Sequence, residues 1–170
     1  MARSNTLEVW QRGAVPEVPF LLQPVAHALL QAREEIEELM IDFPQELLWK
    51  RPFGMASCGF HLQHLSGVID RLFTYARDEK LNKAQFAQLA EEKDAFHEFT
   101  VSHLIQRFSG QVDAALIQLK KADVQTLTDF RSVGRAQLPS SVLGLLFHAA
   151  EHTMRHLGQL IVTVKVVKEL

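Results

Sequence analysis

The stretch that decides the fold is LLFHAAEHTMRHLGQL, residues 145–160. Its apolar residues recur at intervals of three and four, which is the period of an amphipathic α-helix. His148, His152 and His156 follow one another at intervals of four, so successive imidazoles lie about 40° apart around the helix. The stretch therefore predicts a final helix, from about residue 140 to the C-terminus, that carries a row of histidines towards its neighbours.

A second such stretch, FHLQHLSGVIDRLFTYA, occupies residues 60–76. Ser57 is a suitable N-cap residue, and a helix from there to about Arg77 has an apolar stripe on one side. His61 and His64 lie beside this stripe at a spacing of three. Two helices of the chain are thus expected to bring imidazoles to the same interior.

Three further helices are expected: a long one over 18–41, a short one over 82–93 and a long one over 96–121. Pro24 marks either the true start of the first of these or a kink within it. Residues 160–167 are rich in β-branched side chains, but no turn signal separates them from the preceding helix. We therefore expect them to continue that helix.

The remaining segments are an N-terminal arm and a long connection. Residues 1–16 have no hydrophobic period and are expected to lie over the domain, docked by Trp10. Residues 122–139 are expected to form an irregular loop, which is longer than helical bundles normally use and is therefore a candidate for function. No repeat or composition shift divides the chain, so we expect a single domain over 1–170, with the helical bundle over 17–168.

Composition excludes several classes of protein. With 47% hydrophobic and 22% charged residues, the 170-residue chain can bury a core and is not disordered. Eight glycines and six prolines are few for a many-turned β fold, which favours an all-α class. The net charge of −2 predicts no nucleic-acid partner, and the lack of an apolar run of about 20 residues predicts no membrane span. A single cysteine, Cys58, and no recognisable secretory signal predict a cytoplasmic location.

The histidine pattern predicts a metal site. An i, i+4 pair of imidazoles can direct two nitrogens to one ion, and a third can come from His61 or His64 on the other helix. Burying several imidazoles without a common partner costs about 1–3 kcal/mol for each unsatisfied nitrogen, and an ion removes that cost. A single histidine beside an apolar stripe is more often an ordinary core or surface residue, which is our interpretation of His27, His97 and His103.

The two histidine-bearing stretches, 60–76 and 145–160, resemble the signature helices of the DinB/YfiT-like superfamily. Members of that superfamily are up-down-down-up four-helix bundles that hold a divalent metal ion with three histidines. The resemblance covers roughly residues 20–168. It implies an all-α fold of that topology, here with an N-terminal arm and short extra helices.

Carried over residue by residue, the family pattern implies three metal ligands: His64, His152 and His156. The family's last ligand belongs to an H-R-G-Q run, whose arginine is replaced by Leu157 in this chain. The resemblance therefore implies one divalent ion, but this chain has no arginine at the position of the family's arginine.

Other polar residues lie within one helical turn of the implied ligands. His61, His148 and Gln159 are candidates to orient a ligand or a bound water, and the alternative for each is an ordinary hydrogen bond to backbone or solvent. Asp70 and Glu151 are close in sequence, but helical geometry is expected to turn both well away from the neighbouring ligand. No fourth carboxylate ligand is therefore expected.

Three neutral imidazoles leave an ion with an open coordination position, which is typical of catalytic sites. Zinc and nickel both suit imidazole nitrogen and are the expected ions. Characterised members of the superfamily include thiol S-transferases and thiol-dependent isomerases. The resemblance thus implies a metal-dependent enzyme, a thiol transferase or a hydrolase, whose substrate is a small molecule such as a low-molecular-weight thiol. The alternative is a stress-associated binding or interaction protein with a structural metal.

Two expectations concern the surroundings of the site. Family members frequently pair, so the resemblance implies a homodimer. Arg131 and Arg135, in the connection before the last helix, are expected to border the mouth of the site and to bind substrate carboxylates. The alternative is that these arginines pair with acidic side chains and hold the connection in place.

Overall fold

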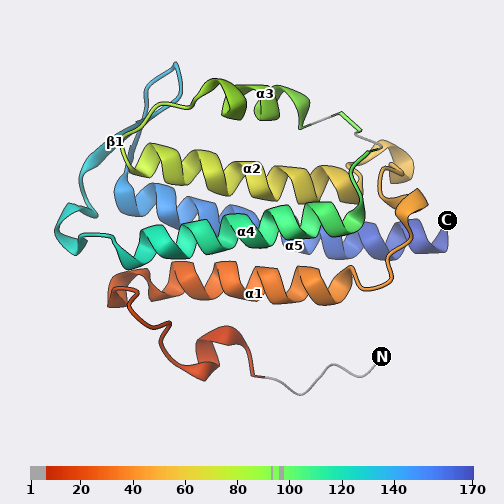
Figure 1. Cartoon of the computed structure of the whole chain (residues 1–170), viewed down its shortest axis with the longest axis horizontal. Helices are drawn as coiled ribbons and strands as arrows, with labels where there is room; N and C mark the ends of the chain where they lie inside the picture. The colour runs from red at the N-terminus through yellow and green to blue at the C-terminus, as the bar shows by residue number, and fades with distance from the viewer. Residues whose placement is uncertain (1–6, 93, 96–97) are drawn as a thin grey trace.

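The computed structural model describes residues 7–92, 94–95 and 98–170 (Figure 1). This part of the chain is mainly helical, which confirms the predicted class. The helices are α1 (Gln23–Leu39), α2 (Cys58–Ala76), α3 (Lys83–Glu91), α4 (Val101–Lys120) and α5 (Val142–Glu169), and two short strands, β1 (Phe130–Val133) and β2 (Leu138–Ser141), form a hairpin.

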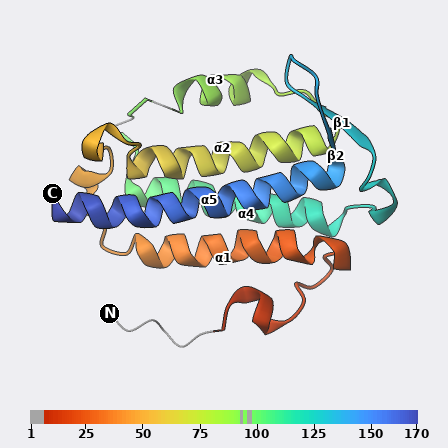
Figure 2. The same cartoon turned by 180° about the vertical axis from the view of Figure 1, so that it is seen from behind.

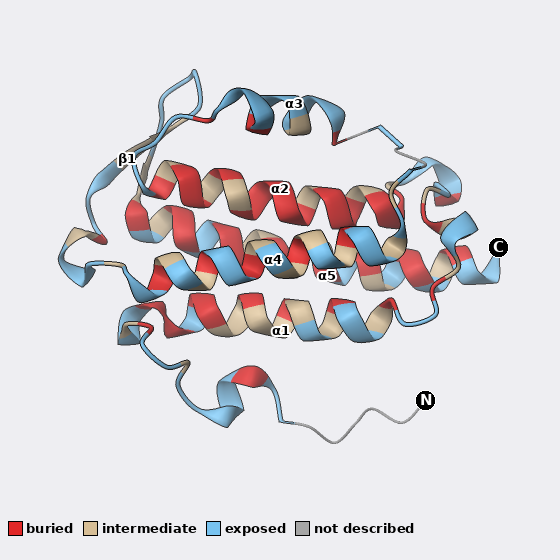
Figure 3. Cartoon of the chain, viewed as in Figure 1, coloured by how far each residue is buried: buried red, intermediate tan, exposed pale blue. Residues whose placement is uncertain are grey.

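The four long helices lie side by side, whereas the short helix α3 lies outside them along α2 (Figures 1 and 2). The closest packing is between α2 and α5, the two helices that carry the histidine stretches. Buried residues follow the inward sides of the long helices (Figure 3). The histidines of α2 and α5 therefore face each other within the molecule rather than across an open surface.

Side-chain caps define where several helices begin. Ser57 accepts a hydrogen bond from the backbone N–H of Phe60 at 3.1 Å, as predicted, and Asn82 accepts one from Gln85 at 2.9 Å. Pro24 lies in the first turn of α1, so it marks the true start of that helix and not a kink. The predicted start of α4 at Phe96 lies outside the described residues, and the helix itself begins after Thr100.

One continuous hydrophobic core joins the long helices. Its largest fully buried side chains come from all four of them, from the segment before α1 and from the connection between α1 and α2: Leu22, Leu29, Ile36, Leu48, Leu62, Leu65, Ile69, Phe73, Leu104, Phe108, Leu119 and Leu146. Polar side chains enter this interior mainly on α2. Buried polar groups require partners, so these side chains identify the part of the interior where a site is to be sought.

The prediction that Trp10 docks the N-terminal arm is wrong. Trp10 is 61% exposed, and its indole N–H donates to Glu8. The arm is held instead by Val9, which is buried and whose N–H donates to Gln31, and by a two-pronged ion pair between Arg12 and Glu34. A short apolar side chain fits the surface of α1 here, and the guanidinium supplies the directional contact.

The prediction of an irregular connection over 122–139 is also wrong. Phe130 pairs with Ser141 and Val133 pairs with Leu138 in an antiparallel register, and Gly134, at φ +67°, helps to form the turn. The strands are only four residues long and lack a regular apolar alternation, so their sequence gave little signal. None of the described helices is long and apolar enough to cross a membrane.

Candidate metal centre

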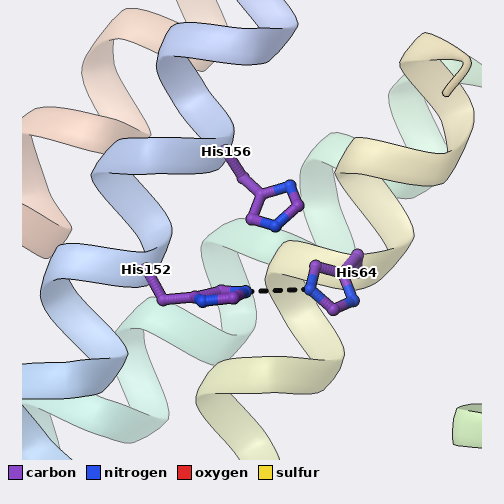
Figure 4. Close-up of side chains that lie close together, drawn as sticks. All are labelled: His64, His152 and His156. Carbon is purple, nitrogen blue, oxygen red and sulfur yellow. Dashed lines mark hydrogen bonds between the residues drawn. The ribbon is translucent and has the colours of Figure 1, made fainter. Parts of the chain in front are cut away.

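Three imidazoles from two helices meet between α2 and α5. Figure 4 shows His152 and His156 projecting from α5 towards His64 on α2. The Nε2 atoms of His64 and His152 are 3.0 Å apart, and the ring centroid of His156 lies 4.5 Å from that of His64 and 4.6 Å from that of His152. The helical spacing of four places both α5 rings on the side that faces α2.

A buried carboxylate that sequence reasoning missed orients one of these rings. Glu92, just after α3, is 6% exposed and accepts a hydrogen bond from Nδ1 of His64 at 2.8 Å. Its other oxygen is paired with Arg71. Burial alone would raise the pKa of Glu92, but the hydrogen bonds from His64 and Arg71 outweigh burial and hold that pKa below its usual value.

The ionised Glu92 fixes the tautomer of His64. A carboxylate only accepts hydrogen bonds, so Nδ1 of His64 must carry a proton, and in the neutral ring Nε2 then carries the lone pair. Nε2 of His64 faces Nε2 of His152 (Figure 4). A histidine that donates to a carboxylate through one nitrogen and offers the other is the usual form of a metal-ligating imidazole.

A glycine makes room for the carboxylate. A Cβ atom at Gly67 would collide with the carboxylate of Glu92 and would lie 2.5 Å from Nη1 of Arg71. Gly67 therefore permits the close approach of Glu92 to α2. The short helix over 82–93 was predicted, but no local pattern in the sequence indicated that the end of α3 reaches His64.

The inner imidazoles are held neutral. Burial, together with the nearby His64, lowers the pKa of His61 and of His156 to about 4 and lowers the pKa of His152 as well. Each of these rings therefore has a free lone pair at neutral pH. The neutral form is the one that binds metal ions.

The structure places the three residues predicted to assist the ligands in different surroundings. His61 is 3% exposed, and its Nδ1 is 3.0 Å from Nδ1 of His156. His148 is about half exposed and contacts Glu151 at 2.8 Å. Gln159 is exposed on α5. Of the three, only His61 is in hydrogen-bond contact with a ring of the central cluster.

The expectation that Glu151 turns away from the neighbouring ligand is wrong. Ligand atoms of His148, Glu151 and His152 all lie within 4.8 Å of one another. At spacings of three and four, these side chains lean over the same turn of α5, which brings the carboxylate back towards both rings. The carboxylate of Asp70 accepts from Gln85 of α3 and belongs to neither group of potential ligands among the described residues.

The residues of the central cluster fit a divalent ion. Ligand atoms of His64, His152 and His156 lie within 4.8 Å of one another, whereas two nitrogens at about 2.0–2.1 Å from one ion are at most about 4.2 Å apart. The 3.0 Å separation of His64 and His152 satisfies this limit, and a further closing of about 0.6 Å at most brings in the third ring. Nδ1 of His152 is buried and lacks a hydrogen-bond partner among the described residues. A buried nitrogen without a partner, beside two other imidazoles at this spacing, fits a site that can hold a cation.

A cavity of about 280 Å³ adjoins the cluster and is lined by His64, His152 and His148. Its other walls are mostly apolar, with Val68 and Leu72 from α2. Val133, Leu81 and Leu89 close it on the side of the hairpin and of α3. The connection before α5 thus borders the cavity through a valine and not through its arginines.

The two arginines of that connection lie elsewhere. Arg131 donates to the backbone carbonyls of Ala76 at 3.0 Å and Phe130 at 2.7 Å. Arg135 is exposed in the turn between the strands. Arg131 holds the hairpin against the end of α2. This is close to the alternative in which the arginines hold the connection in place, but the partners of Arg131 are carbonyl groups and not acidic side chains.

The histidines that we interpreted as ordinary are remote from the cluster where the structure describes them. His27 contacts the carbonyl of Gly13 at 3.1 Å, and His103 stacks on Phe99 with ring centroids 4.7 Å apart. His97 lies outside the described residues.

The chain belongs to the DinB superfamily, whose family model matches residues 28–160. The match includes both histidine-bearing stretches, 60–76 and 145–160, and confirms the resemblance drawn from them. No curated protein matches the chain significantly.

Proposed function

We propose that the chain binds one divalent metal ion through His64, His152 and His156 and uses it in the chemistry of a small molecule. The observation that carries this proposal is the convergence of three imidazoles whose ligand atoms lie within 4.8 Å of one another, on two helices, next to a cavity. Zinc or nickel is the proposed ion, because both suit neutral imidazole nitrogen.

The chain's own residues would prepare the site for this chemistry. Glu92 holds His64 in one tautomer, and Arg71 holds Glu92 in its ionised form. When bound, a divalent ion on three neutral ligands keeps its full charge and lowers the pKa of a water or thiol that it binds. The apolar walls at Val68 and Leu72 keep the surroundings of that ligand low in water.

The size and lining of the cavity favour a small substrate. At about 280 Å³ it is at the lower end of ligand pockets, which measure roughly 300–1,000 Å³. The proposed reaction class is transfer of a low-molecular-weight thiol to a small electrophile, with metal-assisted hydrolysis as the second version. Family membership supports the choice of thiol chemistry. His148, which is about half exposed, is a polar group in the lining of this cavity that a substrate from solvent can reach.

A structural metal is the competing proposal. It would require a fourth protein ligand that closes the site. The described residues yield two groups able to hold an ion, each with three members, and Glu92 is turned to the outer nitrogen of His64. This composition supports the version with an open coordination position.

The fold-level part of the proposal is the up-down-down-up topology of a single domain. It is supported by Figures 1 and 2, in which α1 and α5 run in one direction and α2 and α4 in the other. In this arrangement α2 and α5 are antiparallel neighbours. The second half of the stretch 145–160 therefore lies beside the first half of the stretch 60–76.

Metal analysis of protein purified without a histidine tag tests the binding step. We expect about one equivalent of zinc or nickel in each chain, and a loss of affinity of more than about 100-fold in His64→Ala, His152→Ala and His156→Ala, since these exceed the effect of removing an outer partner. His27→Ala is the matched control and should bind as the parent does. Unchanged affinity in the three cluster variants would remove the proposal.

A screen of thiols tests the catalytic step. The loaded protein is assayed for consumption of low-molecular-weight thiols with small electrophiles, and in parallel for hydrolysis of small esters and amides. Activity that disappears in His64→Ala supports an enzyme. Stoichiometric metal with no activity, together with a large fall in thermal stability on removal of the metal, would assign the structural role.

A further inference from the structure

A second group of potential ligands lies on the outer side of the central cluster. His148, Glu151 and His152 occupy positions i, i+3 and i+4 of α5, and their ligand atoms lie within 4.8 Å of one another. Nδ1 of His148 is 2.8 Å from a carboxylate oxygen of Glu151, and the rings of His148 and His152 are 5.3 Å apart. Two imidazoles and one carboxylate are a common ligand set for divalent ions.

This group faces solvent more than the central cluster does. The side chains of His148 and Glu151 are 48% and 31% exposed, against 19% for His64. His148, His152 and His64 nevertheless line the same cavity. The cavity therefore leads from the exposed group to the inner one, and His152 is common to both.

The two groups must compete for His152. A neutral imidazole has one nitrogen with a free lone pair and one that carries the proton. Nε2 of His152 is 3.0 Å from His64, while its Nδ1 is buried without a partner among the described residues. The same ring therefore has a second nitrogen available, and it can bind two ions at once only by losing its proton, so the second ion binds more weakly than the first.

We propose that His148, Glu151 and His152 form an outer divalent-cation site, which shares His152 with the inner site and opposes its occupation. This goes beyond the proposed function, because it adds a site with its own ligands. Arg155 lies on the same turn and donates to both oxygens of Glu151, at 2.6 and 2.7 Å. A cation at the outer site has to displace this arginine, so the outer site is the weaker of the two.

The first test isolates the outer site. The double variant His64→Ala/His156→Ala, without a histidine tag, is titrated with Co²⁺ and followed by visible absorption and equilibrium dialysis. We expect one equivalent to remain bound. Addition of His148→Ala or Glu151→Gln should abolish it, whereas addition of Arg155→Gln should tighten it. If the double variant binds no Co²⁺, or binds it equally well without His148, the outer site does not exist.

The second test uses the intact chain and does not depend on the folding of the double variant. We expect a second, weaker equivalent of Co²⁺, with an affinity about 10-fold below that of the outer site in the double variant, within the usual range of coupling between sites. His148→Ala should remove this second equivalent and leave the first. A chain that binds one equivalent at saturating Co²⁺, with or without His148, would overturn the proposal.

The two proposals fail in different ways. If the inner assignment is wrong, the double variant leaves the tighter equivalent of the intact chain unchanged, while the effect of His148→Ala persists. If the outer assignment is wrong, His148→Ala has no effect on binding, while His64→Ala still removes the tight equivalent.

Discussion

Glu92 accepts a hydrogen bond from His64, which lies 28 positions earlier in the chain. The contact ties the end of the outlying helix α3 to the metal centre. Arg71 holds the same carboxylate from the next turns of α2, so Glu92 is fixed by two partners on one helix. An element that contributes little to the core thus leads directly to Glu92, the buried acidic side chain beside the histidine cluster in the part of the chain that the structure describes.

Replacement of Glu92 by Gln should weaken metal binding by about 10–100-fold without changing the stoichiometry. The amide still accepts a hydrogen bond, but it carries no charge to favour the required tautomer of His64 or to raise the basicity of its Nε2. Competition with a calibrated chelator measures the affinity. The matched control is Glu91→Gln, one residue away and exposed, which should bind like the parent. Equal affinities in the two variants would show that Glu92 does not act on the site.

Gly67→Ala should destabilise the protein, although the same change in an exposed helix stabilises it by up to about 1 kcal/mol. The added Cβ collides with the carboxylate of Glu92 and breaks its pairing with Arg71. Gly110→Ala in α4 is the control, because a Cβ there meets nothing within 4 Å. Urea unfolding should show opposite signs of the change in unfolding free energy for the two variants. Stabilisation by both would mean that the carboxylate finds another position at no cost.

The unfolding free energy of the metal-free protein should fall as the pH drops from about 6.5 to about 4. In the unfolded chain, His61 and His156 take up protons near their ordinary pKa of 6.5, whereas burial holds their pKa at about 4 in the folded state. The unfolded state therefore binds more protons in this window and is favoured there, and above it these groups contribute no pH dependence. For His61, which is 3% exposed, the loss amounts to about 3 kcal/mol at the acid end.

The variant His61→Gln separates this contribution from the rest. It should reduce the pH dependence of the urea midpoint between about pH 6.5 and pH 4 to the part that His156 contributes, because one of the two titrating rings is gone. His103→Gln, on the far side of the molecule, should retain the parent slope. A parent-like slope in His61→Gln would place the titration elsewhere.

Arg131→Gln should lower the unfolding free energy by about 1 kcal/mol and leave metal affinity unchanged. The guanidinium satisfies the carbonyl of Ala76 at the end of α2, and a shorter amide cannot reach it. Arg135→Gln, in the exposed turn, should stay within about 0.5 kcal/mol of the parent. Thermal or urea unfolding decides the point. Weakened binding of small carboxylates in Arg131→Gln, at unchanged stability, would restore the substrate-binding role expected from the sequence.

Periodicity and capping residues were sufficient to predict the helices. The apolar stripe of α2 and the cap at Ser57 fix where that helix begins and which side is buried, since both are local properties of the chain. The same locality explains the failures. Strands β1 and β2 depend on pairing with each other, which no local pattern in the sequence predicts. Val9 holds the arm in place of Trp10 because of its contact with α1, and no local pattern predicts that contact either.

In the candidate site, too, the local features were predictable and the contacts between distant parts of the chain were not. His152 and His156 are related by helical phase, and the family pattern selected His64 over His61. Glu92 was not predictable, because its contact with His64 depends on the path of α3 back along α2. The proximity of Glu151 to His148 depends on side-chain direction within one turn, which spacing alone does not give.

The spacing of His152 and His156 on one uninterrupted helix has a consequence for how this chain can change in length. A residue inserted between them would turn the second ring by about 100° and carry it off the side that faces α2. An insertion in the connection at 77–82, which joins α2 to α3, does not change the direction in which any ring projects from its helix. It only lengthens the connection, at a small cost in loop entropy. Insertions should therefore be tolerated in the connection at 77–82 and not between the two rings of α5.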